Sequence, residues 1–539
     1  MVRHVGLLLC NGPPEALNGV TEAAPGVHLL AHAHLCQRKV QVRAWASERS
    51  LEAAVVAPCG DPCWESLKTL LSTLGPFSIH RIETEARRDA RRFEALACGK
   101  LRRAVSESTI PPEGIRYRIP LDHNPVSRRD ILRLPVRRIA VPLPLLDRSA
   151  CRSQRQCRRC VDSCPVGALT IQAGRLILDR GRCEGCGYCI TACPAGAVRF
   201  PGISLVDILN EVRGVLSVRD GPRVVLFDCW AHTSELLPME AFRVSLPCVG
   251  MLSLHWILAL LAEGAAGVLV MESSERCHAW HAGPRARKAV SLAQLVLSGL
   301  GIRGDRVAAV GTSTEVESES RRLAALPSLE AVHVGNLGDS HTELPQILKR
   351  LADLGDRNCL PVADDTMPFG TAQVNRARCS LCGVCASACP VAALSFSEDA
   401  REARLTFNAA RCDGCRACEE YCPERAITVK RELRVESLGE RRLLHRGKVL
   451  RCRRCGTLVG SANLVRAVCA KLDESTEIER LFQYCPGCRM IAALSPPPQP
   501  SQHAHKQYSV ALTGKSGDRI ARNSEPAPTG GIIPRREAP

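Results

Sequence analysis

Short apolar runs alternate with segments of helical periodicity over the first hundred residues of the chain. The runs at 5–9, 27–35 and 53–57 have the length and apolar content of buried strands, whereas 64–74 spaces its apolar residues as a helix does. Strands that alternate with helices predict an open sheet covered by helices. We therefore expect an α/β section over residues 1–100.

The same alternation returns over 205–354 and predicts a second open α/β section. Its expected strands lie at 223–228, 242–246, 267–271 and 306–310, with helices at 252–263 and 284–300. Both sections have the pattern of flavodoxin-like or Rossmann-like layers, in which ligands lie beyond the carboxyl ends of the strands.

Outside these sections the pattern changes. Residues 101–148 are rich in proline, which breaks helices and interior strands, so they are expected to form a linker or a wrapping segment. Strand-like runs on both sides of 173–174 predict a hairpin. A helix is expected at 463–472. Residues 495–539 are rich in Pro, Ser, Gln and Gly and are expected to be a disordered tail.

Cysteine spacing adds chemistry to this picture. The run C-x2-C-x2-C-x3-C-P occurs twice in a module at 367–430, and a related pair of runs occupies 149–201. Such runs resemble those of bacterial dicluster ferredoxins, in which the fourth cysteine of each run binds the other run's 4Fe-4S cluster. The expected ligands of four such clusters are Cys151, Cys157, Cys160, Cys164, Cys183, Cys186, Cys189, Cys193, Cys379, Cys382, Cys385, Cys389, Cys412, Cys415, Cys418 and Cys422.

The first run of the upstream module is irregular. Gln154 stands at its regular first position, and Cys151 lies further upstream. A longer loop would bring Cys151 to the iron. Otherwise this cluster would be a three-iron form or would take a ligand other than cysteine.

Strand-end cysteines in the α/β sections are candidates for extra centres. One set is Cys10, Cys36, Cys59 and Cys63, and another is Cys229, His232, Cys248 and Cys277. Carboxyl ends of parallel strands meet at one edge, so each set would converge on an additional 4Fe-4S or 2Fe-2S centre. The alternative is that they are separate core cysteines, together with an ordinary surface histidine.

Residues 445–493 hold two C-x2-C pairs, and this spacing predicts a small zinc-ribbon-like or rubredoxin-like domain. Cys452, Cys455, Cys485 and Cys488 would supply four thiolates from two facing hairpins. Zinc is favoured over a single iron because this segment has few of the aromatic residues typical of rubredoxin.

Two stretches resemble known iron-sulfur proteins. The segment around Ala-Ala-Val-Val-Ala-Pro-Cys59 is similar to the N-terminal domain of heterodisulfide reductase A, which carries a cluster. Leu-Pro-Cys248-Val-Gly, Glu263 to Met271 and Glu275-Arg-Cys277-His278 resemble the delta subunit of methyl-viologen-reducing hydrogenase, an electron carrier. That resemblance implies a 2Fe-2S centre. The family has more cysteines than this section, so the alternatives are a retained centre and one that is altered or lost.

The order of parts, with the stretches around Cys452 and Cys485, resembles a family of cytoplasmic 4Fe-4S proteins found with molybdenum-dependent formate dehydrogenases. The resemblance implies an electron-transfer protein that relays single electrons between a dehydrogenase, formate dehydrogenase being the candidate, and another redox carrier. The alternatives are a maturation factor for that enzyme, or a reductase subunit of a heterodisulfide-reductase-like complex. No catalytic residue is expected, because the chain lacks G-x-G-x-x-G, P-loop and C-x3-C-x2-C motifs.

Composition sets the remaining limits. The formal net charge of +17 falls to about +7 once thiolate-bound metal centres are included. Fourteen arginines stand against five acidic residues between Arg102 and Arg159. This excess favours a docking surface for an acidic redox partner, or plain solubility, over nucleic-acid binding. The 30 cysteines read as metal thiolates, and no apolar run matches a signal peptide or a membrane span. A reducing cytoplasm is therefore expected.

Overall fold

We describe the chain from a computed structural model. It covers residues 4–494 except 12–26, 75–77, 84–85, 87–88, 107–114, 119–138, 154–156, 201–202, 230–236, 273–281, 328, 332–342, 356–360 and 473–479. Among the expectations above, those for His232, Cys277 and the tail at 495–539 lie outside the described residues. The chain divides into two compact units, one of residues 1–450 with 460–471 and the other of 451–459 with 472–539.

The first α/β section contains a parallel sheet in the strand order β2-β1-β3-β4. Its central strands are fully buried runs of small and aliphatic residues, as expected for strands covered on both faces. The strands are β1 (Val5–Cys10), β2 (Val27–His32), β3 (Ala53–Ala57) and β4 (Ser78–Arg81), and the helices are α2 (Lys39–Glu48), α3 (Asp61–Ser72) and α4 (Ala90–Ser106).

The second α/β section repeats this topology. Its parallel sheet has the order β12-β11-β13-β14. In both sheets, therefore, the first strand in sequence lies between the second and the third, and the fourth lies at the edge beside the third. The predicted parallel α/β architecture is confirmed in both sections. The strands are β11 (Val224–Cys229), β12 (Ala241–Leu246), β13 (Gly267–Met271) and β14 (Val307–Val310), and the helices are α8 (Leu205–Leu216), α9 (Leu254–Ala262), α10 (Ala282–Gly299), α11 (Ser313–Ala324) and α12 (Leu344–Leu354).

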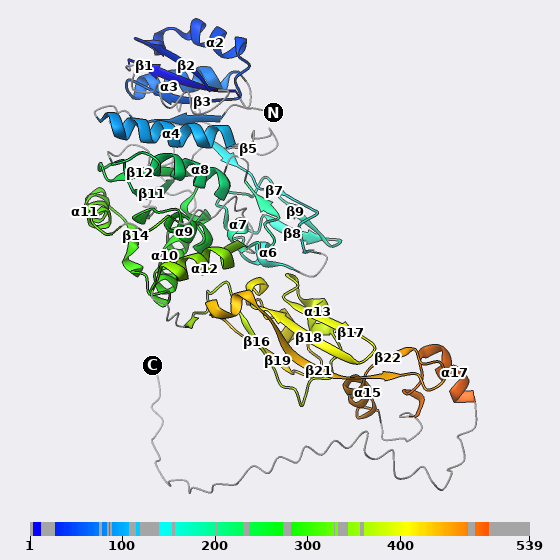
Figure 1. Ribbon diagram of the computed structural model, residues 1–539. Coiled ribbons are helices and arrows are strands. Elements are labelled where there is room, and N and C mark those ends of the chain that lie inside the picture. The colour runs from blue at the N-terminus through cyan, green and yellow to red at the C-terminus, as the bar shows by residue number, and fades with distance from the viewer. Residues whose placement is uncertain are drawn as a thin grey trace, which may run out of the picture. The chain divides into compact units, whose positions relative to one another are not determined.

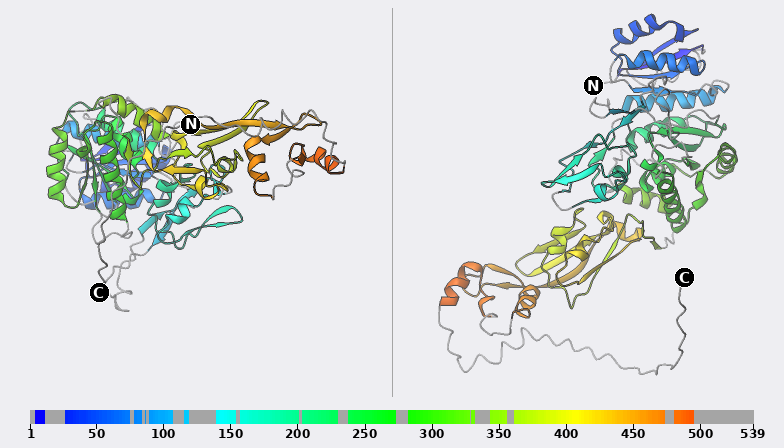
Figure 2. Two further views of the ribbon diagram at one scale, coloured as in Figure 1. Left: turned by 90° about the horizontal axis from the view of Figure 1, so that it is seen from below. Right: turned by 180° about the vertical axis from the view of Figure 1, so that it is seen from behind.

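Helix α4 joins the two sections and runs past the predicted boundary at residue 100 to Ser106. Its buried residues Phe93, Leu96, Leu101 and Ala104 keep helical spacing across that boundary, so the helix continues until the pattern stops. It packs along α8, as Figures 1 and 2 show. The linker expected from residue 101 therefore begins later. It also contains a strand pair, β5 (Ile115–Arg118) with β6 (Ile139–Pro142).

Two glycines allow α4 and α8 to approach closely. A Cβ added at Gly214 would lie 2.6 Å from the Cα of Gly99, and backbone atoms cannot move aside as a flexible side chain can. Gly214→Ala should therefore destabilise the chain by about 1–3 kcal/mol, although alanine is the better helix former. The measurement is the urea unfolding midpoint followed by circular dichroism.

The matched control is Gly311→Ala, whose added Cβ would meet, among the described residues, only the Glu315 carboxylate at an ordinary 3.7 Å. This control should change stability by less than about 0.5 kcal/mol. Equal stability of Gly214→Ala and the wild type would show that the two helices are not in close contact.

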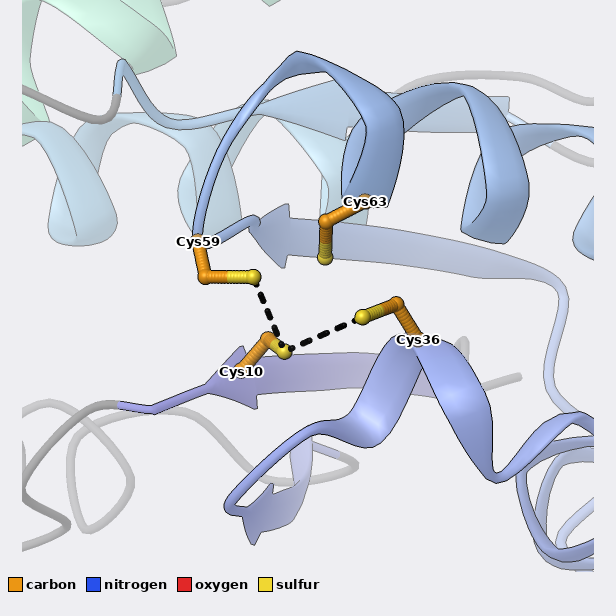
Figure 3. Close-up of side chains that lie close together, drawn as sticks. All are labelled: Cys10, Cys36, Cys59 and Cys63. Carbon is orange, nitrogen blue, oxygen red and sulfur yellow. Dashed lines mark hydrogen bonds between the residues drawn. The ribbon is translucent and has the colours of Figure 1, made fainter.

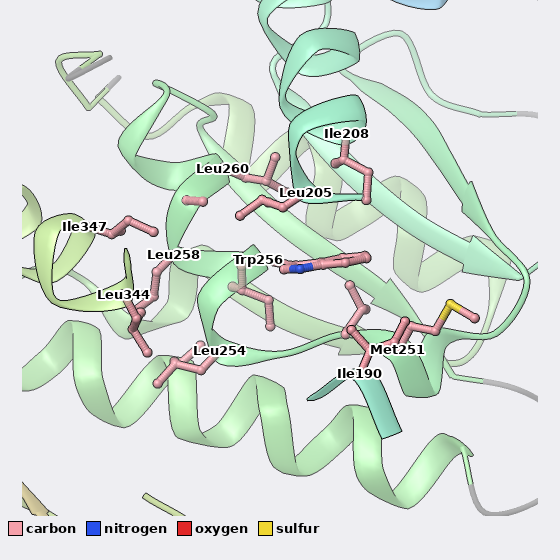
Figure 4. Packing of buried hydrophobic residues seen from close by; sticks show 14 of the residues in the cluster. Ile190, Leu205, Ile208, Met251, Leu254, Trp256, Leu258, Leu260, Leu344 and Ile347 are labelled. Carbon is pink, nitrogen blue, oxygen red and sulfur yellow. The ribbon is translucent and has the colours of Figure 1, made fainter. Parts of the chain in front are cut away.

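The core of the second section reaches into the first cysteine-rich module. Trp256 on the wholly buried helix α9 packs among Leu205, Ile208 and Leu254, and Ile190 of the module belongs to the same cluster (Figure 4). Burial of this apolar surface contributes about 25 cal/mol per Å² to stability. The module and the section are therefore held together by a shared core.

The two cysteine-rich modules have the same plan, in which hairpins separate two short helices. The predicted hairpin around Ala173 and Gly174 is present, and both of these turn residues have positive φ. The first module consists of β7 (Leu145–Leu146), α6 (Arg159–Asp162), β8 (Leu169–Gln172), β9 (Arg175–Leu178), α7 (Tyr188–Ala192) and β10 (Val198–Arg199). The second consists of β16 (Thr371–Val374), α13 (Val384–Ala388), β17 (Leu394–Glu398), β18 (Glu402–Asn408), α14 (Ala417–Glu420) and β19 (Ile427–Lys430).

The elements that follow complete the fold. Strand β18 also pairs with the long β21 (Arg441–Arg451), and β15 (Val362–Ala363) pairs with β20 (Glu432–Leu433). Strand β22 (Leu458–Ser461) leads into α15 (Ala462–Cys469), which matches the helix predicted at 463–472, and α17 (Pro486–Leu494) closes the described chain. No helix in the described part of the chain combines the length and apolarity that crossing a membrane requires.

Candidate metal centres

The upstream module gathers its irregular run around a hollow that we call site A. Cys151, Cys157 and Cys160 line this hollow together with Cys193 from the other run. Burial raises the pKa of Cys160 to about 12, and the neighbouring charges of Cys193, Cys157 and Cys151 add to the rise. Cys151 therefore lies in this site, whereas Gln154, at the regular first position of the run, is outside the described residues. The crossing of Cys193 from the second run is the ferredoxin arrangement.

The second set in this module, site B, consists of Cys164, Cys183, Cys186 and Cys189. Burial raises the pKa of Cys186 to about 11. A hydrogen bond from the Tyr188 backbone opposes the rise, and the charges of Cys164 and Cys183 add to it. Cys164 comes from the first run, so the runs cross over in both directions.

The downstream module has the same two sets. Site C is lined by Cys379, Cys382, Cys385 and Cys422, the last from the second run. Site D consists of Cys412, Cys415, Cys418 and Cys389, the last from the first run. Burial raises the pKa of Cys412 to about 12, and the nearby charges of Asp413, Cys389 and Cys415 add to the rise.

Backbone amides are aimed at sulfur in all four runs. The N–H four residues after the last cysteine donates to its Sγ at 3.2–3.3 Å, from Ala168, Ala197, Ala393 and Ala426. These donors stabilise a charged thiolate, whereas burial without a metal raises the thiol pKa. Bound iron supplies the missing positive charge. The thiols, their crossing pattern and these donors therefore fit 4Fe-4S clusters.

The first α/β section gathers four thiols at the carboxyl edge of its sheet (Figure 3). Cys10 ends β1, Cys36 follows β2, Cys59 follows β3, and Cys63 lies in the first turn of α3. The Sγ of Cys10 lies 3.8 Å from that of Cys36 and 3.6 Å from that of Cys59. We call this group the N-terminal tetrathiol site.

The second unit contains a similar group, the C-terminal tetrathiol site, formed by Cys452, Cys455, Cys485 and Cys488. The Sγ atoms of Cys455 and Cys485 are 3.6 Å apart. Burial by itself would raise the pKa of Cys452, but N–H donors from Cys485, Cys455 and Arg454 lower it to about 6.

One feature of this second unit differs from the prediction. The pair Cys485 and Cys488 lies at the start of helix α17, not on a hairpin. Pro486 favours the first turn of a helix, and the following Met490-Ile491-Ala-Ala-Leu stretch favours its continuation. The first pair, by contrast, lies in a tight turn in which the Gly456 N–H donates to the Cys452 carbonyl at 2.9 Å.

Cys229 and Cys248 occupy the places in the second sheet that Cys10 and Cys36 occupy in the first. Cys229 is the last residue of β11, and Cys248 follows β12 directly before the 3₁₀ turn η7 (Val249–Met251). Both are buried. The described residues thus contain two thiols of the predicted extra centre.

The two modules meet at an ion pair that the sequence patterns do not indicate. Arg159 Nε lies 3.6 Å from Asp413 Oδ2, and an Arg159 Nη donates to the Asp413 carbonyl at 3.3 Å. The Asp413 side chain is only 2% exposed, and its Oδ1 accepts from the Cys415 N–H. Both residues lie between cluster cysteines, Arg159 in site A's run and Asp413 in site D's.

The second α/β section contacts site B. Arg285 from α10 stacks on the Tyr188 ring at 4.4 Å and donates to Thr191 Oγ1 at 2.9 Å. Met251, at the end of η7, packs so closely on Gly187 that a side chain there would collide with it. The same short turn therefore links Cys248 to site B.

Arg159 and Asp413 carry no sequence signal of their own, because a charged residue between cluster cysteines is ordinary. Arg285 carries none because it lies on helix α10, far from the cysteine runs in sequence. Alignment of the four runs does not single out Arg159 either. It aligns with Tyr188, Val384 and Ala417, and each of these residues also begins a short helix.

Comparison with protein families gives two matching families over three segments of the chain. Residues 151–197 and 378–426 match the 4Fe-4S dicluster domain, and residues 229–325 match the delta subunit of methyl-viologen-reducing hydrogenase. No curated protein sequence matches the chain significantly. These matches confirm the predicted ferredoxin modules and the likeness of the second α/β section to the delta subunit. They class the chain as an iron-sulfur protein of the electron-transfer kind.

Proposed function

We propose that the chain relays single electrons between two partner proteins through sites B, A, D and C, in that order. A 4Fe-4S cluster accepts and releases one electron at a time. The protein's part is to hold such groups close together and to set the charge around them. The contact of Arg159 with Asp413 carries the proposal, because it brings site A of one module beside site D of the other.

Charge at this contact acts on both modules. Burial raises the pKa of Cys415 to about 12, Asp413 adds to the rise, and Arg159 opposes it from the other module. For Cys157, burial again raises the pKa, a hydrogen bond from the Arg159 backbone lowers it, and Cys193 and Asp413 raise it. An arginine and an aspartate that each influence sulfur in both modules support a relay that continues from one to the other.

The contacts around site B support an entry or exit for electrons there. Arg285 and Met251 attach site B to the section that resembles a hydrogenase delta subunit. We propose that this section docks one partner and that the second partner meets the chain near site C. Formate dehydrogenase is the candidate donor, as the order of parts implies.

The relay is tested by redox titration of the anaerobically purified chain, followed by electron paramagnetic resonance. The wild type should take up about four electrons reversibly, one per 4Fe-4S site. Arg159→Glu adds negative charge beside sites A and D, so two of the four reduction potentials should fall by on the order of tens of millivolts. The other two should stay unchanged.

The matched control is Arg158→Glu, which makes the same charge change on an exposed side chain that pairs with Asp162 at 3.5 Å. It should leave all four potentials near their wild-type values, because water screens an exposed charge. A shift confined to one site in Arg159→Glu would mean that the modules are not adjacent, and a chain that takes up no electrons reversibly would end the relay proposal.

The partner is tested separately. Formate with a molybdenum-dependent formate dehydrogenase should bleach the iron-sulfur absorbance of the chain within seconds, as a chemical reductant does. If the chemical reductant bleaches the chain but formate with the enzyme does not, formate dehydrogenase is rejected as the donor. That result would not contradict the relay itself.

We also propose that the C-terminal tetrathiol site binds structural zinc. Its four sulfur atoms lie within 4.8 Å of one another, which suits one tetrahedral ion with thiolate ligands. The low pKa of Cys452, about 6, favours the thiolate that zinc requires.

A further inference from the structure

The N-terminal tetrathiol site differs in its sulfur spacing from the four ferredoxin sites. All four of its sulfur atoms lie within 4.8 Å of one another. Among the described residues, only this group and the C-terminal tetrathiol site are this tight. The cysteines of sites A and C instead line hollows. The spacing therefore separates the cysteines of this chain into two classes.

Spacing reports how many metal ions a set of thiolates can hold. Four thiolates around one tetrahedral ion, each about 2.3 Å from it, lie about 3.8 Å from one another. The measured separations from Cys10, 3.8 Å to Cys36 and 3.6 Å to Cys59, have this value. In a 4Fe-4S cluster each thiolate binds a different iron, and in a 2Fe-2S cluster the thiolates form two separated pairs. Neither arrangement brings all four sulfurs this close together.

The surroundings also suit a single ion. Cys10 and Cys63 are buried, and Cys59 is exposed, which leaves an entry path for a metal ion. Cys63 lies in the first turn of α3, where the helix dipole stabilises negative charge.

We propose that Cys10, Cys36, Cys59 and Cys63 bind one tetrahedrally coordinated ion of the zinc or iron class, and not an iron-sulfur cluster. The ion clamps the carboxyl ends of β1 and β3 to the loop after β2 and to the start of α3. This role goes beyond the proposed relay, because the site lies outside sites A to D. It also differs from the cluster that the resemblance to heterodisulfide reductase A implies.

The test counts iron, zinc and acid-labile sulfide per chain in the anaerobically purified full-length protein. Cys59→Ser changes an exposed ligand, so the surrounding core should stay packed. We expect it to lose about one zinc or one iron per chain, with sulfide unchanged. Cys98→Ser is the matched control, a half-buried cysteine on α4 outside every set, and it should lose nothing.

Loss of irons together with an equal number of sulfides in Cys59→Ser would overturn the proposal, and so would an unchanged metal content. Cobalt gives a second measurement, because a four-thiolate Co²⁺ site has intense visible absorption. The wild type should bind two Co²⁺ ions per chain at four-thiolate sites. Cys59→Ser should bind only the one at the C-terminal tetrathiol site, and Cys455→Ser only the one at the N-terminal tetrathiol site. The iron and sulfide content of sites A to D should be the same in both variants as in wild type. Failure of the single-ion proposal can therefore be told apart from failure of the relay proposal.

Discussion

Replacement of Glu211 by glutamine is expected to lower the free energy of unfolding by about 3–5 kcal/mol. Glu211 on α8 is almost wholly buried and pairs with Lys100 and with Arg103, the latter at 2.7 Å, both from α4. Glutamine keeps the shape but removes the negative charge that faces two buried cations. Because α4 joins the two α/β sections, denaturant unfolding followed by tryptophan fluorescence should report the loss.

The control for this variant is Glu317→Gln on α11, which removes an exposed pair with Arg321. Exposed pairs contribute about 1 kcal/mol or less, so stability should change little. A similar small change in Glu211→Gln would show that the buried pair contributes no more than a surface one.

The same residue makes a prediction about pH. Burial alone would raise the pKa of Glu211, but Lys100 and Arg103 lower it to about 2, below the value of 4.5 for an exposed glutamate. A lowered folded-state pKa means that the stabilisation is complete above about pH 4.5 and is lost as pH falls toward 2. The stability difference between wild type and Glu211→Gln should therefore be constant from about pH 7 to 5.5 and narrower near pH 3.5.

Removal of Cys151 is expected to have the largest effect on metal content. Cys151→Ala leaves site A with Cys157, Cys160 and Cys193, so at least one of about sixteen irons should be lost. Oxidised protein should then show the paramagnetic signal of a three-iron cluster, or lose the whole cluster. Iron analysis and electron paramagnetic resonance measure the outcome.

Cys98→Ser serves as the control and should keep full iron content. The double variant Cys151→Ala with Gln154→Cys restores the regular C-x2-C-x2-C-x3-C spacing and should recover the lost iron. Full iron in Cys151→Ala alone would mean that another group is the ligand at site A.

Local sequence patterns predicted much of the architecture. The strands expected at 53–57 and 267–271 are present with those bounds, because buried strands of parallel sheets are short continuous apolar runs. The predicted ends of elements were less accurate than their positions in the chain. The helix expected from Trp64 starts at Asp61, because Pro62 favours the first turn of a helix and Gly60 is the N-cap residue. Strand β4 was not predicted, because its Ser-Ile-His-Arg sequence is short and half-buried.

Metal chemistry was predictable where the ligands are close in sequence. The cysteine runs of sites B, C and D bend around a common centre by local backbone geometry, including positive φ at Gly383. The sequence by itself therefore determined that this protein has ferredoxin modules, α/β sections and thiols at strand ends.

Only the tertiary structure decided which of these groups meet. The contact of Arg159 with Asp413 joins residues 254 positions apart in sequence. The ion pairs of Glu211 with residues of α4 likewise join residues more than a hundred positions apart. Such contacts depend on how whole elements pack. The distance between the sulfurs of Cys10, Cys36 and Cys59 likewise depends on where three strands end. Spacing along the chain identifies metal ligands, but only the separation of the sulfur atoms in space distinguishes one ion from a cluster.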